Sequence, residues 1–541
     1  MASISHLPPE LISHIFALTC DLDTSIFFLG AAADISDAAN YPSLVLSHVC
    51  PRWRSFLLAC PKAWSRVTVR ENLSTITCQK VSKIGEIVNM YLTRSGTLPV
   101  DFVIEFPELT ACDPSSYEAQ SLELSAPMYH LLESFLQIYR LFFQHATRWK
   151  KAYLTLNVGI LKNRHASGWP NTFPVLEELE VRVLGLQDDR SDTAPKLEIV
   201  SAPVLRTLVH RGVLVYLATD RGEMLDPLPS LELLTLSEAF YSKNLSLACA
   251  NTSVTLFAIN GIARAPRNAC LARNLRIDVL PTWGGERTLD YICSSLDLPH
   301  ITHLRAESLP NDSVISGPYG IRLPSEFVGL ISDPTRSSAS TSLTHLTLVS
   351  VLVWPTTLVS VLSHIPALTH FAFGEFAGEY AWVYEADDDH DEDDTRIAMP
   401  PLTPAFFESL TFSSLNGTRT RLLPNLQVLH LAFGFGSGAA GSAFTLTGSK
   451  SEALLNVLNS RLIDSGLENE DDQASENGVC LHTVRLILPA LSRREVEDEE
   501  EGVVYWMDEL SSGMKLDCTL EWAGTREDWR RLGLGDWTDE E

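Results

Sequence analysis

The chain has 541 residues, of which 45% are apolar and 20% charged, so it is an ordered protein larger than one compact core. Its formal charge is −27, but four windows without Lys or Arg hold 24 of the 68 acids, namely residues 385–394, 464–476, 495–501 and 536–541. The remainder is close to neutral and lacks the basic stripe of a nucleic-acid-binding protein.

The ten cysteines contain no C-x-x-C pair, which indicates reduced structural thiols. The first residues, MASISHLPPEL, lack a basic segment followed by an apolar run, so no secretory signal is expected. The apolar segment 346–362 is interrupted at 354–357 and is too short to cross a bilayer comfortably. We expect a protein of the cytoplasm, the nucleus or both, with no membrane role.

The first predicted element is a helix that begins near residue 8, because Pro8 and Pro9 suit a first helical turn and Glu10 suits the helix dipole. Its apolar residues recur at helical spacing and form one stripe, with Leu7, Leu11, Ile15 and Leu18 in line and Ile12 and Phe16 beside them. Residues 21–42 are rich in Asp, Ala and Ser and predict an inserted loop with room for a helical turn.

Two further short helices are expected, since Pro51 ends one apolar segment and starts the next. The segment closes at Pro61 and Trp64, and the alternating Val67-Thr68-Val69 begins a strand. A three-helix apolar stripe can be simple core. A module of residues 1–70 nevertheless carries more large apolar side chains than it can hide, so a partner or the following chain must cover some of them.

LPPELISHIF, a loop and then LVLSHVCPRWRSFLLACPKAWSRVTV together resemble the F-box, especially the form of large fungal families. RSGTLPVDF and HATRWKKAYLTL resemble the segments next to the F-box in those proteins. The resemblance implies docking on a Skp-type adaptor and, through it, on a cullin. Residues 21–42 make the loop longer than in the minimal motif. The implied adaptor contacts are Leu7, Pro8, Leu11, Ile15, Phe16, Leu44, Val49, Trp53 and Phe56.

Residues 71–170 predict helix–strand units. Apolar spacing from Val81 to Tyr91 marks a helix, 98–104 a strand, 127–145 a helix and 152–158 a strand.

Residues 171–525 carry a recurring L-x-x-L-x-L motif with starts 23 to 29 residues apart where it is regular, which is leucine-rich-repeat spacing. The full motif starts at 176, 231, 301, 343, 368 and 426, and leaner copies start at 205, 254 and 481. We therefore predict an α/β fold, with the three-helix F-box followed by a leucine-rich-repeat-like solenoid of parallel strands alternating with helices. Acidic insertions near 385–394 and 464–476 and an acidic tail at 526–541 are expected to be solvated.

Strand side chains alternate, so the third, fifth and seventh places of the motif face away from the leucines. This predicts a substrate-facing surface. Its candidate residues are Glu178, Glu180, Arg182, His303, Arg305, His345, His370 and His430.

Three of these histidines share the third place, and His345 and His370 are expected on adjacent strands, roughly 5 Å apart. A histidine column is compatible with a metal or pH-responsive contact. It is also compatible with tolerated polar residues on an exposed strand, which we favour.

Catalytic motifs are absent from the sequence, which has no G-x-S-x-G, Walker loop, H-E-x-x-H or strand-linked G-x-G-x-x-G. We expect no catalytic residues, no cofactor and no metal. The favoured hypothesis is a substrate receptor of a ubiquitin ligase that binds an unknown target protein with its repeats. A scaffold that recruits no cullin and an unrecognised enzyme are the alternatives.

Overall fold

The computed structural model forms two compact units, residues 1–249 and 250–541. The structure describes residues 7–21, 28–29, 42–71, 78–105, 126–157, 172–184, 197–199, 201–211, 215–216, 228, 230–237, 248, 251–258, 268–279, 288–308, 321–375, 402–411, 422–433, 449–463, 481–489 and 517–523. All four acidic windows lie outside these residues, as does the tail at 526–541.

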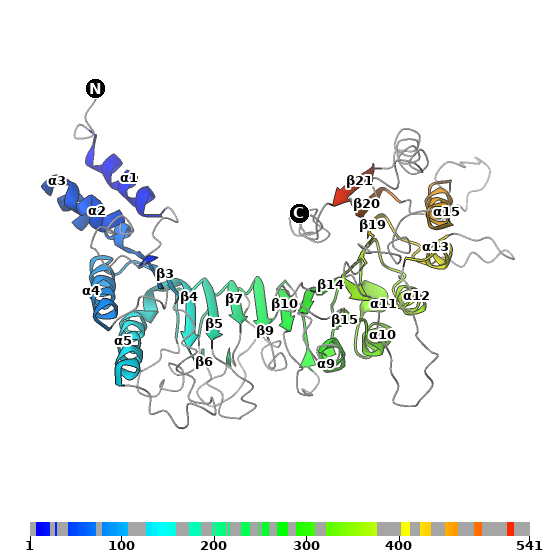
Figure 1. The fold of residues 1–541 in the computed structure, drawn as a ribbon, viewed down its shortest axis with the longest axis horizontal. Coiled ribbons are helices and arrows are strands. Elements are labelled where there is room, and N and C mark those ends of the chain that lie inside the picture. The colour runs from blue at the N-terminus through cyan, green and yellow to red at the C-terminus, as the bar shows by residue number, and fades with distance from the viewer. Residues whose placement is uncertain are drawn as a thin grey trace. The chain divides into compact units, whose positions relative to one another are not determined.

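The first unit opens with helices and continues as a parallel sheet whose strands lie in chain order (Figure 1). Its helices are α1 (Pro9–Asp21), α2 (Pro42–Val49), α3 (Pro51–Leu58), η3 (Pro61–Trp64), α4 (Cys78–Arg94), α5 (Ala126–Phe143) and η6 (Ala146–Arg148). Its strands are β1 (Phe28–Leu29), β2 (Arg66–Glu71), β3 (Val100–Glu105), β4 (Trp149–Asn157), β5 (Glu178–Leu184), β7 (Thr207–Arg211) and β9 (Leu233–Ser237), with a separate parallel pair β6 (Leu197–Glu198) and β8 (Val215–Tyr216).

The second unit repeats this plan, with parallel strands in chain order and helices that pack on their neighbours, α9 on α10, α10 on α12, α12 on α13 and α13 on α15. Its helices are α9 (Thr288–Ser295), α10 (Ser325–Ser332), α11 (Ala339–Ser342), α12 (Pro355–Ser363), α13 (Pro404–Leu410) and α15 (Ser449–Ile463). Its strands are β10 (Ser253–Ala258), β12 (Asn274–Val279), β14 (His303–Ser308), β16 (His345–Val349), β18 (His370–Gly374), β19 (Val428–Ala432), β20 (Thr483–Pro489) and β21 (Asp517–Ala523), with two separate parallel pairs, β11 (Asn268–Ala269) with β13 (Leu296–Asp297) and β15 (Ile321–Arg322) with β17 (Val351–Leu352).

The predicted α/β class with parallel strands is confirmed, and the order of strands is consistent with a solenoid. The repeat strands predicted from the starts at 301, 343, 368, 426 and 481 pair in parallel with their apolar positions in register. The copy predicted to start at Val254 is shifted by three residues, because Val254 pairs with Leu275 in the row of fourth places. One buried row of the second unit comprises Val254, Leu275, Leu304, Leu346, Phe371, Leu429 and Val484. A single repeat could not bury this edge alone, so the stacking of repeats forms the core.

A proline turn precedes several repeat strands. In the segment Phe173-Pro174-Val175-Leu176 the first side chain is buried and the last N–H donates to the first carbonyl at 3.4 Å. The same bond closes 202–205, 365–368 and 423–426, each with proline second. Proline fits this position because its φ is already set for the turn. In these repeats the structural unit is therefore an apolar residue, Pro, any residue and then L-x-x-L-x-L.

Two buried tryptophans link a helix to the strand that follows it in the first unit. Trp64 Nε1–H donates to the Leu57 carbonyl at 2.8 Å, and Trp149 Nε1–H donates to the Phe142 carbonyl at 3.1 Å. Each indole thus buries its large ring while its one polar hydrogen is bonded. Trp64 also meets Tyr91 of α4 edge-on with ring centroids 5.0 Å apart, which ties the N-terminal helices to the sheet layer.

Two predictions differ from the structure. Residues 28–29, predicted within a loop, form β1, which pairs in parallel with the edge of β2 and satisfies part of that edge. The strand β12 was not predicted, because Ala272 stands where the motif has its first leucine. Leu275 and Ile277 nevertheless lie in the buried rows beside Leu304 and Ala306.

Candidate functional site

Helices α1 and α2 expose a group of large apolar side chains. We call this group the apolar face: Leu11, Ile15, Leu18, Val45 and Val49, which are 51%, 39%, 52%, 37% and 55% exposed. The three α1 residues follow helical spacing, and so do the two of α2. Such a concentration of exposed aliphatic side chains within one small segment is typical of an interaction site.

The module fills its own core with a different set of side chains. Ile12, Phe16 and Cys20 form a second stripe of α1 that is buried, and Phe16 meets Trp53 edge-on with centroids 5.0 Å apart. Phe16, predicted as an adaptor contact, is thus 1% exposed and belongs to the module's own packing. The sequence shows one broad stripe, whereas the structure divides it into a buried half and an exposed half.

The other predicted adaptor contacts lie between these extremes. Leu7, Leu44, Trp53 and Phe56 are half-buried, and Pro8 is exposed. The start of α3 is fixed by Pro51 in its first turn and by Cys50, whose Sγ accepts the Trp53 N–H at 3.4 Å. This cap sets the direction in which α3 presents its side chains.

In the first unit, the predicted substrate-facing residues occupy β5. Glu178 is bonded within the sheet, since Lys151 pairs with it and the Tyr153 hydroxyl donates to its Oε2 at 2.7 Å. Glu180 is half-buried and Arg182 is exposed. In the same row as Glu178, Asp101 lies partly buried, and burial raises the pKa of its carboxyl despite the nearby Lys150 and Lys151. The row formed by Asp101, Lys151 and Glu178 therefore contains charges of both signs.

The three third-place histidines form a stacked ladder in the second unit, as their spacing predicts. His303, His345 and His370 are in register on β14, β16 and β18. Their ring centroids are 3.9 Å apart at both steps, with interplanar angles of 18° and 14°. We call these three residues the histidine ladder.

A threonine before each histidine fixes its ring. Each histidine Nδ1 lies 2.8 Å from the Oγ1 of the preceding Thr302, Thr344 or Thr369. Each of these hydroxyls also donates to a main-chain carbonyl of the previous repeat. A hydroxyl has only one hydrogen, so Nδ1 is the protonated nitrogen and Nε2 is the acceptor nitrogen.

The geometry of the ladder does not suit a shared metal ion. Lone pairs lie in the ring planes, so similarly oriented stacked rings direct their Nε2 lone pairs nearly parallel and not toward one point. Among the described residues, no group of three or more His, Cys, Asp or Glu side chains could hold a metal.

His430 does not join the ladder. It occupies the fifth place on β19 and pairs in register with Ala372 and Arg485. Burial, with the nearby Arg485 and His370, lowers the pKa of His430 to about 4. His430 is therefore a neutral side chain at physiological pH.

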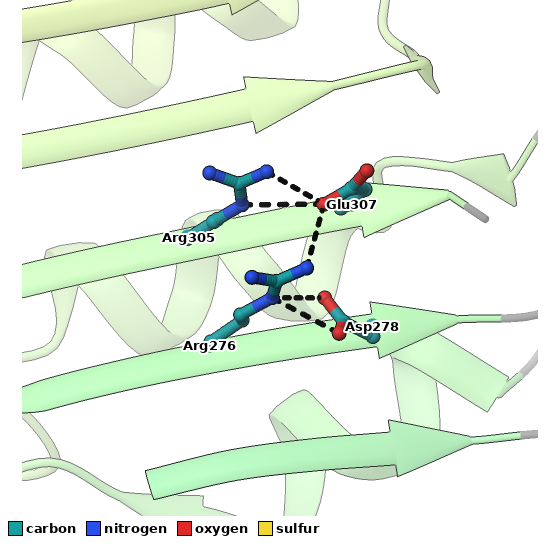
Figure 2. Close-up of polar contacts among 4 residues, drawn as sticks. All are labelled: Arg276, Asp278, Arg305 and Glu307. Carbon is teal, nitrogen blue, oxygen red and sulfur yellow. Dashed lines mark hydrogen bonds and ion pairs between the residues drawn. The ribbon is translucent and has the colours of Figure 1, made fainter. Parts of the chain in front are cut away.

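Arg305 belongs to a polar network that joins the neighbouring strands β12 and β14 (Figure 2). Arg276 donates to Asp278 at 2.7 Å and to Glu307 at 3.1 Å, and Arg305 donates to Glu307 at 2.7 Å. Arg276 and Asp278 were not predicted, because their strand β12 was not predicted. Glu307 lies at the seventh place of β14, which was predicted to face substrate, but its side chain is buried. The two apolar residues Leu275 and Ile277, two positions apart, were the feature of the sequence that could have revealed strand β12.

Comparison with known proteins adds no relative. No protein-family model matches the chain, and a search of curated proteins returns no similar sequence. Among the helices that the structure describes, none is both long and apolar enough to span a bilayer.

Proposed function

We propose that the chain is the substrate-recognition subunit of an SCF-type ubiquitin ligase. Its F-box-like N-terminal helices would dock on a Skp-type adaptor and thereby on a cullin. Its leucine-rich-repeat-like strands would bind the target protein, in the cytoplasm, the nucleus or both. The role is non-catalytic, since presenting a target to the ligase core needs binding surfaces alone.

The apolar face carries this proposal. The buried stripe of α1 packs in the module's core, whereas Leu11, Ile15 and Val49 keep 51%, 39% and 55% of their surface exposed. Burying an aliphatic side chain contributes about 1.5–3 kcal/mol, so leaving several in water is unfavourable unless a partner covers them. The resemblance to the F-box identifies that partner as the Skp-type adaptor.

Co-purification with a Skp-type adaptor and cullin tests the proposal. Leu11→Asp combined with Val49→Asp places two charges in the apolar face and should weaken adaptor binding more than about 100-fold. Both side chains are more than half exposed, so the fold should persist, which circular dichroism would check. The matched control is Val204→Asp, an aliphatic residue that is 40% exposed on a turn of the same unit.

Each outcome has a plain meaning. If the wild-type chain does not bind the adaptor, or the double variant binds it as tightly as the Val204 control, the receptor function is wrong. A complex that contains the adaptor but excludes the cullin would favour the scaffold alternative.

A further inference from the structure

Two histidines lie beside the apolar face, one on each of its helices. On α1, His14 follows Leu11 by three positions and precedes Leu18 by four, so helical spacing places it on the same side as both. On α2, His48 follows Val45 by three positions. Both histidines are exposed. A partner that covers the aliphatic side chains of this face therefore also covers two titratable groups.

The opposite sides of the two helices form the core of the module. On α1 this side consists of Ile12, Phe16 and Cys20, and on α2 it consists of Ser43 and Ser47, all of them buried. The two imidazoles lie outside this core and do not take part in its packing. A change in their charge should therefore affect docking and not the packing of the module.

Few charged groups surround the two imidazoles. Within the described part of the chain, neither ring has a hydrogen bond or an ion pair. Glu10 lies four positions before His14, a spacing at which an acid and a base on one helix attract each other. The helix of the second histidine, α2, contains no acid. The elements that pack on α1 and α2 contribute the exposed bases Arg52 and Arg54 of α3 and Lys62 of η3.

Docking on an apolar surface distinguishes the two charge states of an imidazole. The neutral ring has only two polar atoms and is covered at a small cost. A protonated ring loses its hydration and is strongly disfavoured unless an acid of the partner replaces that hydration. Histidine is the side chain that ordinarily changes its charge between about pH 5 and 8. A fall in pH through this range should therefore weaken docking.

We propose that the apolar face is a pH-sensitive docking site, which binds the Skp-type adaptor while His14 and His48 are neutral and releases it when they take up protons from solvent. The inference rests on the proposed function, because it describes how binding of the adaptor would be regulated. It requires an apolar adaptor surface over both histidines, which fits the aliphatic side chains of Leu11, Leu18 and Val45 around them.

The test measures adaptor binding to the full chain at two pH values. Isothermal titration with a purified Skp-type adaptor at pH 7.5 and 6.0 gives both affinities. Each proton that must leave on docking weakens binding by up to about tenfold per pH unit, so we expect affinity at pH 6.0 to be about fivefold lower or less. Repeating the titration at pH 6.0 in two buffers of different ionisation enthalpy counts the protons, and docking should release them.

Three variants assign this response to the two histidines. His14→Gln with His48→Gln should abolish both the loss of affinity at pH 6.0 and the release of protons, because glutamine does not titrate. His14→Lys with His48→Lys is charged at both pH values and should bind weakly at both. The matched control is His130→Gln, at an exposed position of α5, which should keep the full pH response. Circular dichroism at pH 6.0 checks that each chain stays folded.

The outcomes keep the two proposals apart. Wild-type affinity that is equal at the two pH values, or higher at pH 6.0, would overturn the inference and leave the receptor function standing. A loss at pH 6.0 that persists in the double glutamine variant would do the same, because the titrating groups would then lie elsewhere. A chain that does not bind the adaptor at pH 7.5 would contradict the receptor function and the regulation that rests on it.

Discussion

His210 occupies a place on β7 where the neighbouring strands have Val181 and Leu236. It is 3% exposed, and within the described part of the chain its Nε2 has no hydrogen-bond partner. Burial lowers its pKa to about 3. The folded chain therefore keeps this imidazole neutral at a pH where the unfolded chain protonates it.

This titration predicts a loss of stability in acid. The unfolded state takes up a proton near pH 6.5 and the folded state does so only near pH 3, so the free energy of unfolding falls as pH drops through this window. The slope is about 1.4 kcal/mol per pH unit for one histidine. His210→Leu should be more stable than the wild type at pH 7.5 by about 1–2 kcal/mol, because an unpaired buried nitrogen is removed. The difference should grow by about 1 kcal/mol at pH 5.5.

Urea unfolding followed by tryptophan fluorescence at the two pH values would measure this. His300→Leu is the control for the exchange of histidine for leucine, since the side chain of His300 is exposed. A difference between wild type and His210→Leu that is the same at pH 7.5 and 5.5 would show that His210 is not held neutral by the fold.

At the scale of elements, three arginines bind the ends of helices that precede them in the chain. Arg148 donates to the Leu92 carbonyl in the last turn of α4, and Arg336 donates to the Cys293 and Leu296 carbonyls at the end of α9. Arg461 of α15 donates to the Leu410 carbonyl at the end of α13. A guanidinium satisfies carbonyls that have no partner within the helix and suits the negative end of the helix dipole.

Arg461 is the most buried of these three. It is 2% exposed and also donates to the Leu422 and Leu423 carbonyls at 2.7 and 2.9 Å. Leu423 has a φ of 54°, a backbone conformation that is unfavourable for leucine. Arg461 donates to the carbonyl of this residue. Arg461→Met should therefore lower the free energy of unfolding by about 3–5 kcal/mol, because several buried carbonyls lose their donors.

Thermal and urea unfolding would measure the loss. Arg140→Met is the matched control, since Arg140 pairs with Glu133 on the partly exposed side of α5 and such pairs contribute less than about 1 kcal/mol. A small loss for Arg461→Met, equal to that of the control, would mean that the hydrogen bonds to the Leu410, Leu422 and Leu423 carbonyls do not stabilise the fold.

Sequence periodicity predicts the elements well where leucines mark them. The strands β14, β16, β18, β19 and β20 and the adjacency of His345 and His370 follow from the L-x-x-L-x-L motif alone, because parallel repeats place equal positions side by side. Strand β12 was not predicted, because Ala272 stands at the place of the motif's first leucine. The spacing of apolar residues does not identify contacts between residues that are distant in the sequence. Neither the bond from Arg276 to Glu307 nor the division of α1 into two apolar stripes could therefore be predicted.

At the scale of the whole molecule, adaptor binding is proposed to depend on the aliphatic side chains of the apolar face. Because 24 of the 68 acids are gathered in four windows, the rest of the chain is nearly neutral and produces little long-range field. The response of adaptor binding to salt should therefore follow from these aliphatic side chains.

Salt should have little effect on adaptor binding. Ions screen exposed charges over about 10 Å at 0.1 M and about 3 Å at 1 M, whereas burial of aliphatic side chains does not depend on screening. Raising NaCl from 0.05 to 0.5 M should therefore change adaptor affinity less than about threefold. Isothermal titration of the full chain with the adaptor at the two salt concentrations measures this. A loss of about tenfold or more would mean that the contact made by Leu11, Ile15 and Val49 is not the one that holds the adaptor.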